Sequence, residues 1–213
     1  MTNRSGGRNR NKRGEGGKLR DELIAAASRL LETADGQESL SLRAVARAAG
    51  ISPQSLYLHF ADRRALLTAV YEVRFAELAN ELAATSATDP PTRLREICHA
   101  YCEYGLRNPG HYRVLFGTAG TPGWEPTDAQ LPGLPVFRSL VEAVNDCGGV
   151  DRSDDSSDDS SDDPSDDPTA TAICIWAAMH GLITLRQDRP SFPWPPLPHL
   201  LDTLVTAHLG TTP

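Results

Sequence analysis

The stretch that decides the fold is residues 41–60, SLRAVARAAGISPQSLYLHF. It describes two short helices, each preceded by a serine, Ser41 or Ser52, whose side chain can cap the helix N-terminus. Gly50 tolerates positive φ and can end the first helix, while Pro53 suits the first position of the second. Apolar residues at helical spacing would hold the pair together: Leu42, Val45, Ala46, Ile51 and Leu56. The segment predicts a helix-turn-helix.

Helical periodicity continues on both sides of this segment. One helix is expected from about residue 18 to 34, and Asp62 can cap a long helix that runs to about residue 85. Further helices are expected at about 92–107, 111–118, 134–147, 169–186 and 197–209, with breaks at Asn108-Pro109-Gly110 and in a loop over 119–132. The helix at 169–186 is apolar nearly all round, which is typical of a buried helix. Alternating apolar and polar residues form no run of useful length, so the predicted fold class is all-α, with about nine helices.

Charge is separated along the chain. The 213 residues carry a net charge of −7, but residues 1–20 hold seven Lys or Arg and one Glu, a local net of +6. Residues 151–167 hold nine Asp and one Arg, a local net of −8. We expect residues 1–17 to be a disordered basic arm that can contact a polyanion, and residues 151–168 to be a disordered acidic insert. A sharper hypothesis is that the insert screens the arm and thereby tunes its affinity for nucleic acid.

The residues that face outward from residues 41–60 can form hydrogen bonds with DNA. A glutamine can read adenine with two hydrogen bonds, while serine, tyrosine and histidine can donate to phosphates. Helix N-termini also favour phosphate oxygens, and the basic arm can enter a minor groove through Arg10, Lys12 and Arg13. The residue types and their spacing therefore predict DNA binding, with the second helix entering the major groove. The alternative is a purely structural helix pair.

This segment resembles the TetR family of bacterial regulators over about residues 18–75. The matching residues are Ser41, Val45-Ala46, Ala49-Gly50-Ile51-Ser52, Leu56-Tyr57-Leu58-His59-Phe60, and Arg63 with Leu66. The resemblance implies that eight residues contact DNA: Ser41, Arg43, Ser52, Gln54, Ser55, Tyr57, His59 and Arg63. Three residues depart from the family pattern. Gln54 stands where glycine is common and suggests its own base preference, Arg63 replaces the usual lysine, and Leu58 occupies a position that is often polar and receives no contact.

The C-terminal half resembles the regulatory domain of one TetR subgroup, through residues 108–116, NPGHYRVLF, and through Trp176-x3-His180-Gly181. The resemblance implies a helix-turn-helix domain at 18–64 and a ligand-binding and dimerisation domain at 65–213, with the helices at 169–186 and 197–209 pairing two subunits. The candidate ligand-binding residues are Tyr101, Tyr104, His111, Tyr112, Phe116, Phe137, Trp176 and His180. Aromatic residues at helical spacing can equally be plain core, and His180 can be a satisfied core histidine.

Other function classes find little support. Cys98, His99 and Cys102 invite a metal or redox interpretation, but no second Cys/His pair with zinc spacing follows, so no metal and no cofactor are expected. The sequence contains no nucleophile elbow or phosphate loop, and we expect no enzyme activity. Four cysteines among apolar neighbours indicate free thiols in a reducing cytoplasm. No secretory signal or run of 18 apolar residues is present, and we expect no membrane span.

The sequence thus predicts a cytoplasmic homodimer that places two recognition helices in successive major grooves of a pseudopalindromic operator. An apolar or aromatic effector in the C-terminal core would release a repressor from this DNA. One rival is a DNA-binding regulator that is controlled by a protein partner and has no small-molecule pocket. A second rival is an enzyme grafted on a helical fold, which a polar cluster in the core would signal.

Overall fold

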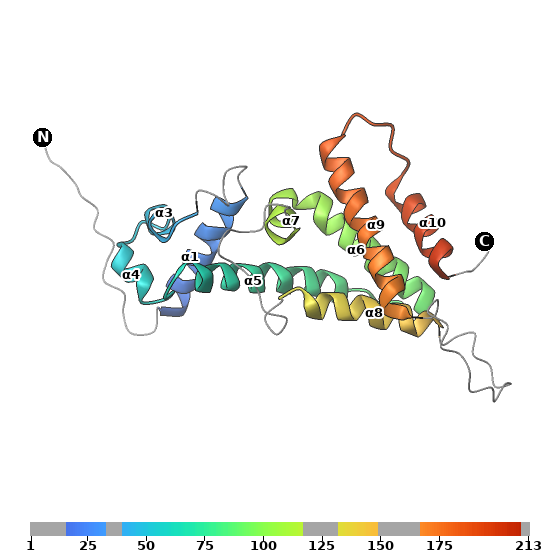
Figure 1. Cartoon of the computed structure of the whole chain (residues 1–213), viewed down its shortest axis with the longest axis horizontal. Helices are drawn as coiled ribbons and strands as arrows, with labels where there is room; N and C mark the ends of the chain where they lie inside the picture. The colour runs from blue at the N-terminus through green and yellow to red at the C-terminus, as the bar shows by residue number, and fades with distance from the viewer. Residues whose placement is uncertain (1–15, 33–39, 117–131, 149–166, 210–213) are drawn as a thin grey trace, which may run out of the picture. The chain divides into compact units, whose positions relative to one another are not determined.

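The computed structural model describes residues 16–32, 40–116, 132–148 and 167–209, and every regular element in these ranges is a helix (Figure 1). The helices are α1 Gly16–Leu31, α3 Leu42–Ala48, α4 Pro53–Tyr57, α5 Arg63–Ala83, α6 Pro90–Arg107, α7 Pro109–Phe116, α8 Leu134–Gly148, α9 Pro168–Asp188 and α10 Leu197–Leu209. The all-α fold class and each expected helix are confirmed. Most of the basic arm and the acidic insert lie outside the described residues, as do residues 119–131 of the loop expected at 119–132.

Three expected boundaries were wrong. Residues 16 and 17, assigned to the arm, already belong to α1. The expected C-terminal end of the acidic insert, residue 168, was also too late. The Asp167 carboxylate accepts a hydrogen bond from the Thr169 N–H at 2.8 Å, and Pro168 is the first residue of α9. These two residues are therefore a helix start, because an aspartate cap followed by proline is a favourable N-terminus. The break expected at 108–110 consists of Asn108 alone. Pro109 and Gly110 belong to the first turn of α7, because proline fits the first turn of a helix.

The chain forms two compact units, which divide within α5 after Val70. In the first unit, fully buried apolar side chains from α1, α3, α4 and α5 form the core: Leu23, Ala27, Val45, Leu56, Leu66 and Leu67. The turn between α3 and α4 depends on Gly50, whose φ of +69° is disfavoured for residues that have a Cβ atom. The Arg20 guanidinium lies 5.1 Å from the centre of the Phe60 ring and covers one edge of this core.

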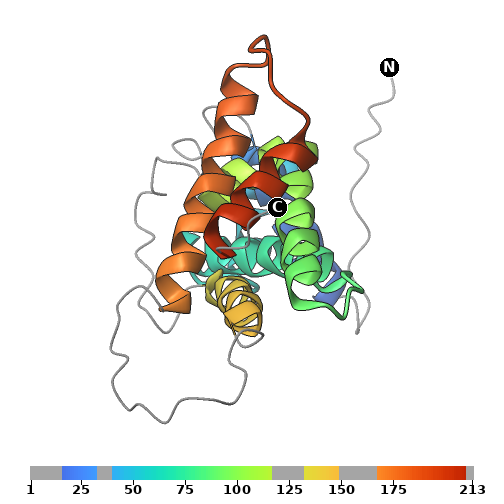
Figure 2. The ribbon, with the colours of Figure 1, turned by 90° about the vertical axis from the view of Figure 1, so that its right-hand side faces the viewer.

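In the second unit α6 is the central helix and packs against α7, α8, α9 and α10. Figure 2 shows α9 and α10 side by side, joined by an extended connection. Close approach to α6 is possible because Gly105 has no side chain. A Cβ atom there would lie 2.8 Å from Ile183 of α9 and 2.9 Å from the Tyr112 ring of α7. This contact fixes where α7 and α9 meet the central helix.

Helix α9 differs from expectation in its burial. An 18-residue window of this 21-residue helix has a mean hydropathy of 1.4, so by length and composition the helix could cross a membrane. Only 22% of that window is buried within the chain. The buried face packs in the core through Ala172, Ile175, Met179 and Ile183. The single chain thus buries only one face of the apolar helix, and the opposite face is apolar and exposed.

Candidate DNA-binding face and candidate effector site

The serines that precede α3 and α4 act as helix caps. The Ser41 Oγ accepts a hydrogen bond from the Ala44 N–H at 3.1 Å, and the Ser52 Oγ accepts one from the Ser55 N–H at 3.2 Å. The Ser52 and Ser55 hydroxyls also lie 2.9 Å apart. These bonds fix the turn and the first turn of α4, so the serine oxygens first satisfy the backbone of the protein.

One face of α4 is buried and the opposite face is exposed. Leu56 is fully buried, whereas Gln54 is exposed and Tyr57 keeps 55% of its surface exposed. Arg43 on α3 is also exposed, while His59 is half-buried. The structure therefore presents an amide, a phenol and a guanidinium on the two helices of the motif.

Arg63 has a role inside the first unit that the sequence did not reveal. Its Nε–H donates to the backbone carbonyl of Leu40 at 3.0 Å. Leu40 is buried and directly precedes the Ser41 cap. The side chain thus anchors the start of α3 from the start of α5. Because the contact joins residues 23 positions apart, no local pattern in the sequence signals it.

Six of the eight predicted effector-site residues come together in one aromatic cluster: Tyr101, Tyr112, Phe116, Phe137, Trp176 and His180. A chain of hydrogen bonds crosses it. The Trp176 Nε1–H donates to the Tyr101 hydroxyl at 2.9 Å, the Tyr101 and Tyr112 hydroxyls lie 3.0 Å apart, and the Tyr112 hydroxyl lies 2.7 Å from the His180 Nδ1. Three helices, α6, α7 and α9, contribute to this chain.

The direction of these hydrogen bonds follows from the indole, which can only donate. If the Tyr101 hydroxyl donates to Tyr112, and Tyr112 donates to a neutral His180, every O–H in the chain has an acceptor. The opposite direction would leave the Tyr101 proton without an acceptor within the chain. Burial raises the pKa of both tyrosines, so both remain protonated. Burial also lowers the pKa of His180, which favours its neutral form.

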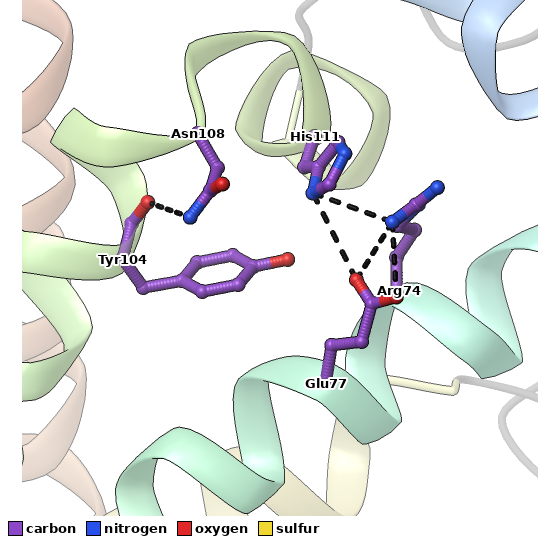
Figure 3. A network of polar contacts seen from close by, with 5 residues as sticks. All are labelled: Arg74, Glu77, Tyr104, Asn108 and His111. Carbon is purple, nitrogen blue, oxygen red and sulfur yellow. Dashed lines mark hydrogen bonds and ion pairs between the residues drawn. The ribbon is translucent and has the colours of Figure 1, made fainter.

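The other two predicted effector residues, Tyr104 and His111, belong to a second polar group (Figure 3). The Arg74 guanidinium pairs with the Glu77 carboxylate at 2.8 Å and donates to the His111 Nδ1 at 3.4 Å. The Glu77 carboxylate also lies 3.8 Å from this nitrogen. The His111 nitrogen therefore lies near both the guanidinium and the carboxylate of this ion pair. Figure 3 shows the Tyr104 hydroxyl pointing toward this group, while Asn108 donates to the Tyr104 carbonyl at 3.0 Å.

A cleft of about 380 Å³ lies between the end of α5 and the first half of α6. Its lining includes Glu81, Arg95, Glu96 and Glu103. This polar lining does not match the apolar or aromatic effector that the sequence predicts.

The cysteines of α6 are buried thiols. Burial raises the pKa of Cys98 and of Cys102 to about 12, so both are protonated at neutral pH and are poor metal ligands or nucleophiles. Within the described ranges, no group of three or more His, Cys, Asp or Glu residues is placed to hold a metal ion.

The lowered pKa of His180 predicts a pH dependence of stability. The unfolded chain takes up this proton near pH 6.5, whereas the folded chain takes it up only at lower pH. Stability should therefore be unaffected by this group above pH 6.5 and should fall as the pH drops below it. His180→Asn keeps an acceptor for the Tyr112 hydroxyl but does not titrate. Thermal unfolding of both proteins at pH 7.5 and 5.5 checks this: the wild type should lose more stability, and equal losses would contradict the assignment.

Two compact helical units, one with a capped helix-turn-helix and one with an aromatic core, define the class of two-domain DNA-binding transcription regulators. Residues 23–70 match the family model described as bacterial regulatory proteins, tetR family. Residues 94–209 match the model described as tetracyclin repressor-like, C-terminal domain. The second match covers more than half of the chain, and the chain belongs to the TetR family. Family and fold thus indicate a transcription regulator.

The chain is also similar to individual curated relatives and solved structures. The nucleoid occlusion factor SlmA of Salmonella paratyphi A is 30% identical over 102 residues, which are 47% of this chain and 52% of the relative. The chain thus matches about half the length of these curated relatives. A Rhodococcus sp. RHA1 protein of unknown function is 27% identical, with a TM-score of 0.68 over 94% of this chain and 96% of its own. A TetR family transcription regulator from Marinobacter aquaeolei VT8 shares the fold at 17% identity, with a TM-score of 0.68 and coverage of 93% and 97%.

Proposed function

We propose that the protein is a cytoplasmic homodimeric repressor that binds a pseudopalindromic operator and is released by a small apolar or aromatic effector. The observation that carries the DNA-binding part is the exposed face of α4. Leu56 anchors this helix, while Gln54 and Tyr57 point away from the core. Two such helices in a dimer would enter major grooves one helical turn, about 34–36 Å, or a multiple apart.

The contacts on the operator divide into base readout and phosphate contact. Gln54 is the candidate base reader, because its amide can pair with adenine through two hydrogen bonds. Arg43, Tyr57 and His59 are candidates for phosphate contacts. Ser41, Ser52 and Ser55 are further candidates for contacts with the operator. Their hydroxyls also form the hydrogen bonds that cap α3 and α4. Arg63 remains a candidate through its guanidinium, although its Nε is engaged with Leu40.

The homodimer is proposed from the exposed face of α9. From residue 168 to residue 185 the helix contains no Asp, Glu, Lys or Arg. Its exposed side includes Ile173, Cys174, Ala177 and Leu185. A helix turns about 100° per residue, which places these residues roughly opposite the buried Ile175, Met179 and Ile183. An exposed apolar stripe of this length favours a helix of a second subunit as its cover.

The effector site is proposed at the aromatic cluster of Tyr101, Tyr112, Phe116, Phe137, Trp176 and His180. The rings offer an apolar environment, and the hydrogen-bond chain offers donors and acceptors that an effector can exchange for its own. Tyr104 and His111 stand in the neighbouring polar group and would respond through α7, which carries His111, Tyr112 and Phe116. An effector acts only through different affinities for the DNA-binding and released states.

A second candidate is a DNA-binding regulator that a protein partner controls. One observation favours it: every O–H in the hydrogen-bond chain of the aromatic cluster can find its acceptor within the protein. Thermal unfolding with a panel of aromatic and apolar compounds separates the two. A compound that stabilises the protein and releases DNA supports an effector-controlled repressor; release by a protein alone supports the second candidate.

The DNA-binding proposal is tested by selecting bound sequences from a random duplex pool at near-physiological salt. We expect an inverted repeat, whose enrichment is lost in Tyr57→Ala. Gln54→Ala should bind the selected operator about 1–3 kcal/mol more weakly and should relax selection at one symmetric pair of positions. Leu58→Ala is the matched control, because Leu58 is 86% exposed and has no assigned contact. Equal selection by wild type and Tyr57→Ala would overturn the proposed recognition helix.

A further inference from the structure

The connection between α9 and α10 begins with Arg189 and continues as an uncharged run over residues 190–196, with four prolines and two aromatic residues. Phe192 keeps 56% of its surface exposed. Its ring centre lies 4.7 Å from that of Trp194, so the two rings form one apolar projection. A single exposed aromatic residue is common on protein surfaces, but a paired and fixed one is a candidate contact for another molecule.

The projection is held rigidly by hydrogen bonds. The Trp194 Nε1–H donates to the Arg189 carbonyl at 3.0 Å, and the Phe192 backbone N–H donates to the same carbonyl at 3.1 Å. The Trp194 backbone N–H donates to the Phe192 carbonyl at 2.7 Å. On α9, the Arg186 guanidinium lies 5.3 Å from the centre of the Trp194 ring and donates to the Pro195 carbonyl. A binding partner would therefore meet a surface that loses little conformational entropy.

The location of the projection indicates what covers it. It follows the exposed apolar face of α9, whose last member, Leu185, is 52% exposed, after the polar stretch Arg186-Gln187-Asp188-Arg189. It also leads directly into α10, and α9 and α10 lie side by side (Figure 2). No charged residue occurs from Pro190 to Leu197. An apolar partner surface suits this uncharged stretch, and the exposed face of α9 is the apolar surface that precedes it along the chain.

We infer that residues 190–196 extend the homodimer interface and that Phe192 is an anchor against the second copy of the chain. The inference rests on the proposed homodimer through α9. It adds a contact outside the helices: Phe192 inserts against the partner subunit, with Trp194 and Arg186 holding its ring in place. Removing the phenyl group should weaken dimerisation without unfolding the subunit, because the ring is largely exposed in the single chain.

Photo-crosslinking of the full chain tests the contact directly. Photoreactive benzoyl-phenylalanine is placed at position 192 and, as a control, at position 58 on the first unit. After irradiation of purified protein we expect a covalent dimer on a denaturing gel from position 192 only. In parallel, sedimentation equilibrium should show that Phe192→Ala raises the dimer Kd at least tenfold, that Phe192→Leu raises it less, and that Leu58→Ala leaves it unchanged. Thermal unfolding checks that the subunits stay folded.

Comparison with Ala177→Glu on α9 separates this inference from the proposed dimer. If Ala177→Glu dissociates the dimer while position 192 gives no crosslink and Phe192→Ala keeps the wild-type Kd, the inference is overturned and the α9 interface stands. If Ala177→Glu leaves the dimer intact, the proposed α9 interface fails, and the inference that extends it fails as well. A crosslink at 192 and a raised Kd for Phe192→Ala, in a dimer that Ala177→Glu dissociates, support the contact.

Discussion

Replacing Ala177 by glutamate should convert the protein into a monomer that binds its operator about 10²–10⁴-fold more weakly than the wild type. Ala177 is exposed on the apolar face of α9. In a symmetric dimer each subunit would bury one new carboxylate in the interface, and burying an unpaired ion costs several kcal/mol. A monomer also loses the second half-site, and linked binding sites contribute factors of about 10²–10⁴ to overall affinity.

Sedimentation equilibrium measures the loss of the dimer, and operator titration measures the loss of DNA affinity. The matched control is Ala76→Glu, which places the same charge at an exposed alanine of α5. Helix content by circular dichroism should not change in either variant, since both positions are exposed. A dimeric Ala177→Glu protein with wild-type operator affinity would locate the subunit contact on another surface.

Local features of the sequence were sufficient to predict the helix-turn-helix. Capping serines, a proline at the first helical position and a glycine at the turn act within three or four residues, so they are visible in the sequence. The structure shows each of them as expected, including the positive φ of Gly50 and the bonds of Ser41 and Ser52. The same logic applied at Asp167-Pro168 would have placed the start of α9 correctly.

Contacts between distant residues were not predictable in this way. His111 and Tyr112 were assigned to one site, but consecutive helical residues point about 100° apart. The structure accordingly places His111 beside Arg74 and Glu77, and places Tyr112 between Tyr101 and His180. The composition of a single helix cannot reveal these partners, because they come from other helices.

Composition alone does not tell which molecule covers α9. An apolar helix favours a position away from water, and the sequence does not state whether its own chain or a second subunit would provide the cover. In the single chain Ile173 and Trp176 remain 48% and 36% exposed. Trp176 also donates to Tyr101 in the aromatic cluster, so one side chain connects the proposed effector site with the proposed subunit interface.

Replacing Tyr112 by phenylalanine should be among the most destabilising changes that keep the shape of the second unit. The Tyr112 ring is buried, and its hydroxyl lies between the Tyr101 hydroxyl and the His180 Nδ1. The substitution removes both hydrogen bonds without making a cavity large enough to matter. Each buried group that loses its partner costs about 1–3 kcal/mol, which is a large part of a typical domain stability of about 5–15 kcal/mol.

Chemical denaturation at pH 7.5 measures this loss, with Tyr57→Phe as the matched control. Tyr57→Phe also removes a hydroxyl group, but Tyr57 is 55% exposed. The free energy of unfolding of this variant should therefore stay within about 0.5 kcal/mol of the wild type. The two hydroxyls of the chain should also be coupled. In the Tyr112→Phe background, where the hydrogen-bond chain is already interrupted, Tyr101→Phe should lower the free energy of unfolding by about 0.5–3 kcal/mol less than it does in the wild type. Additive losses would mean that the two hydroxyls act independently, and that no continuous hydrogen-bond chain joins Trp176 to His180.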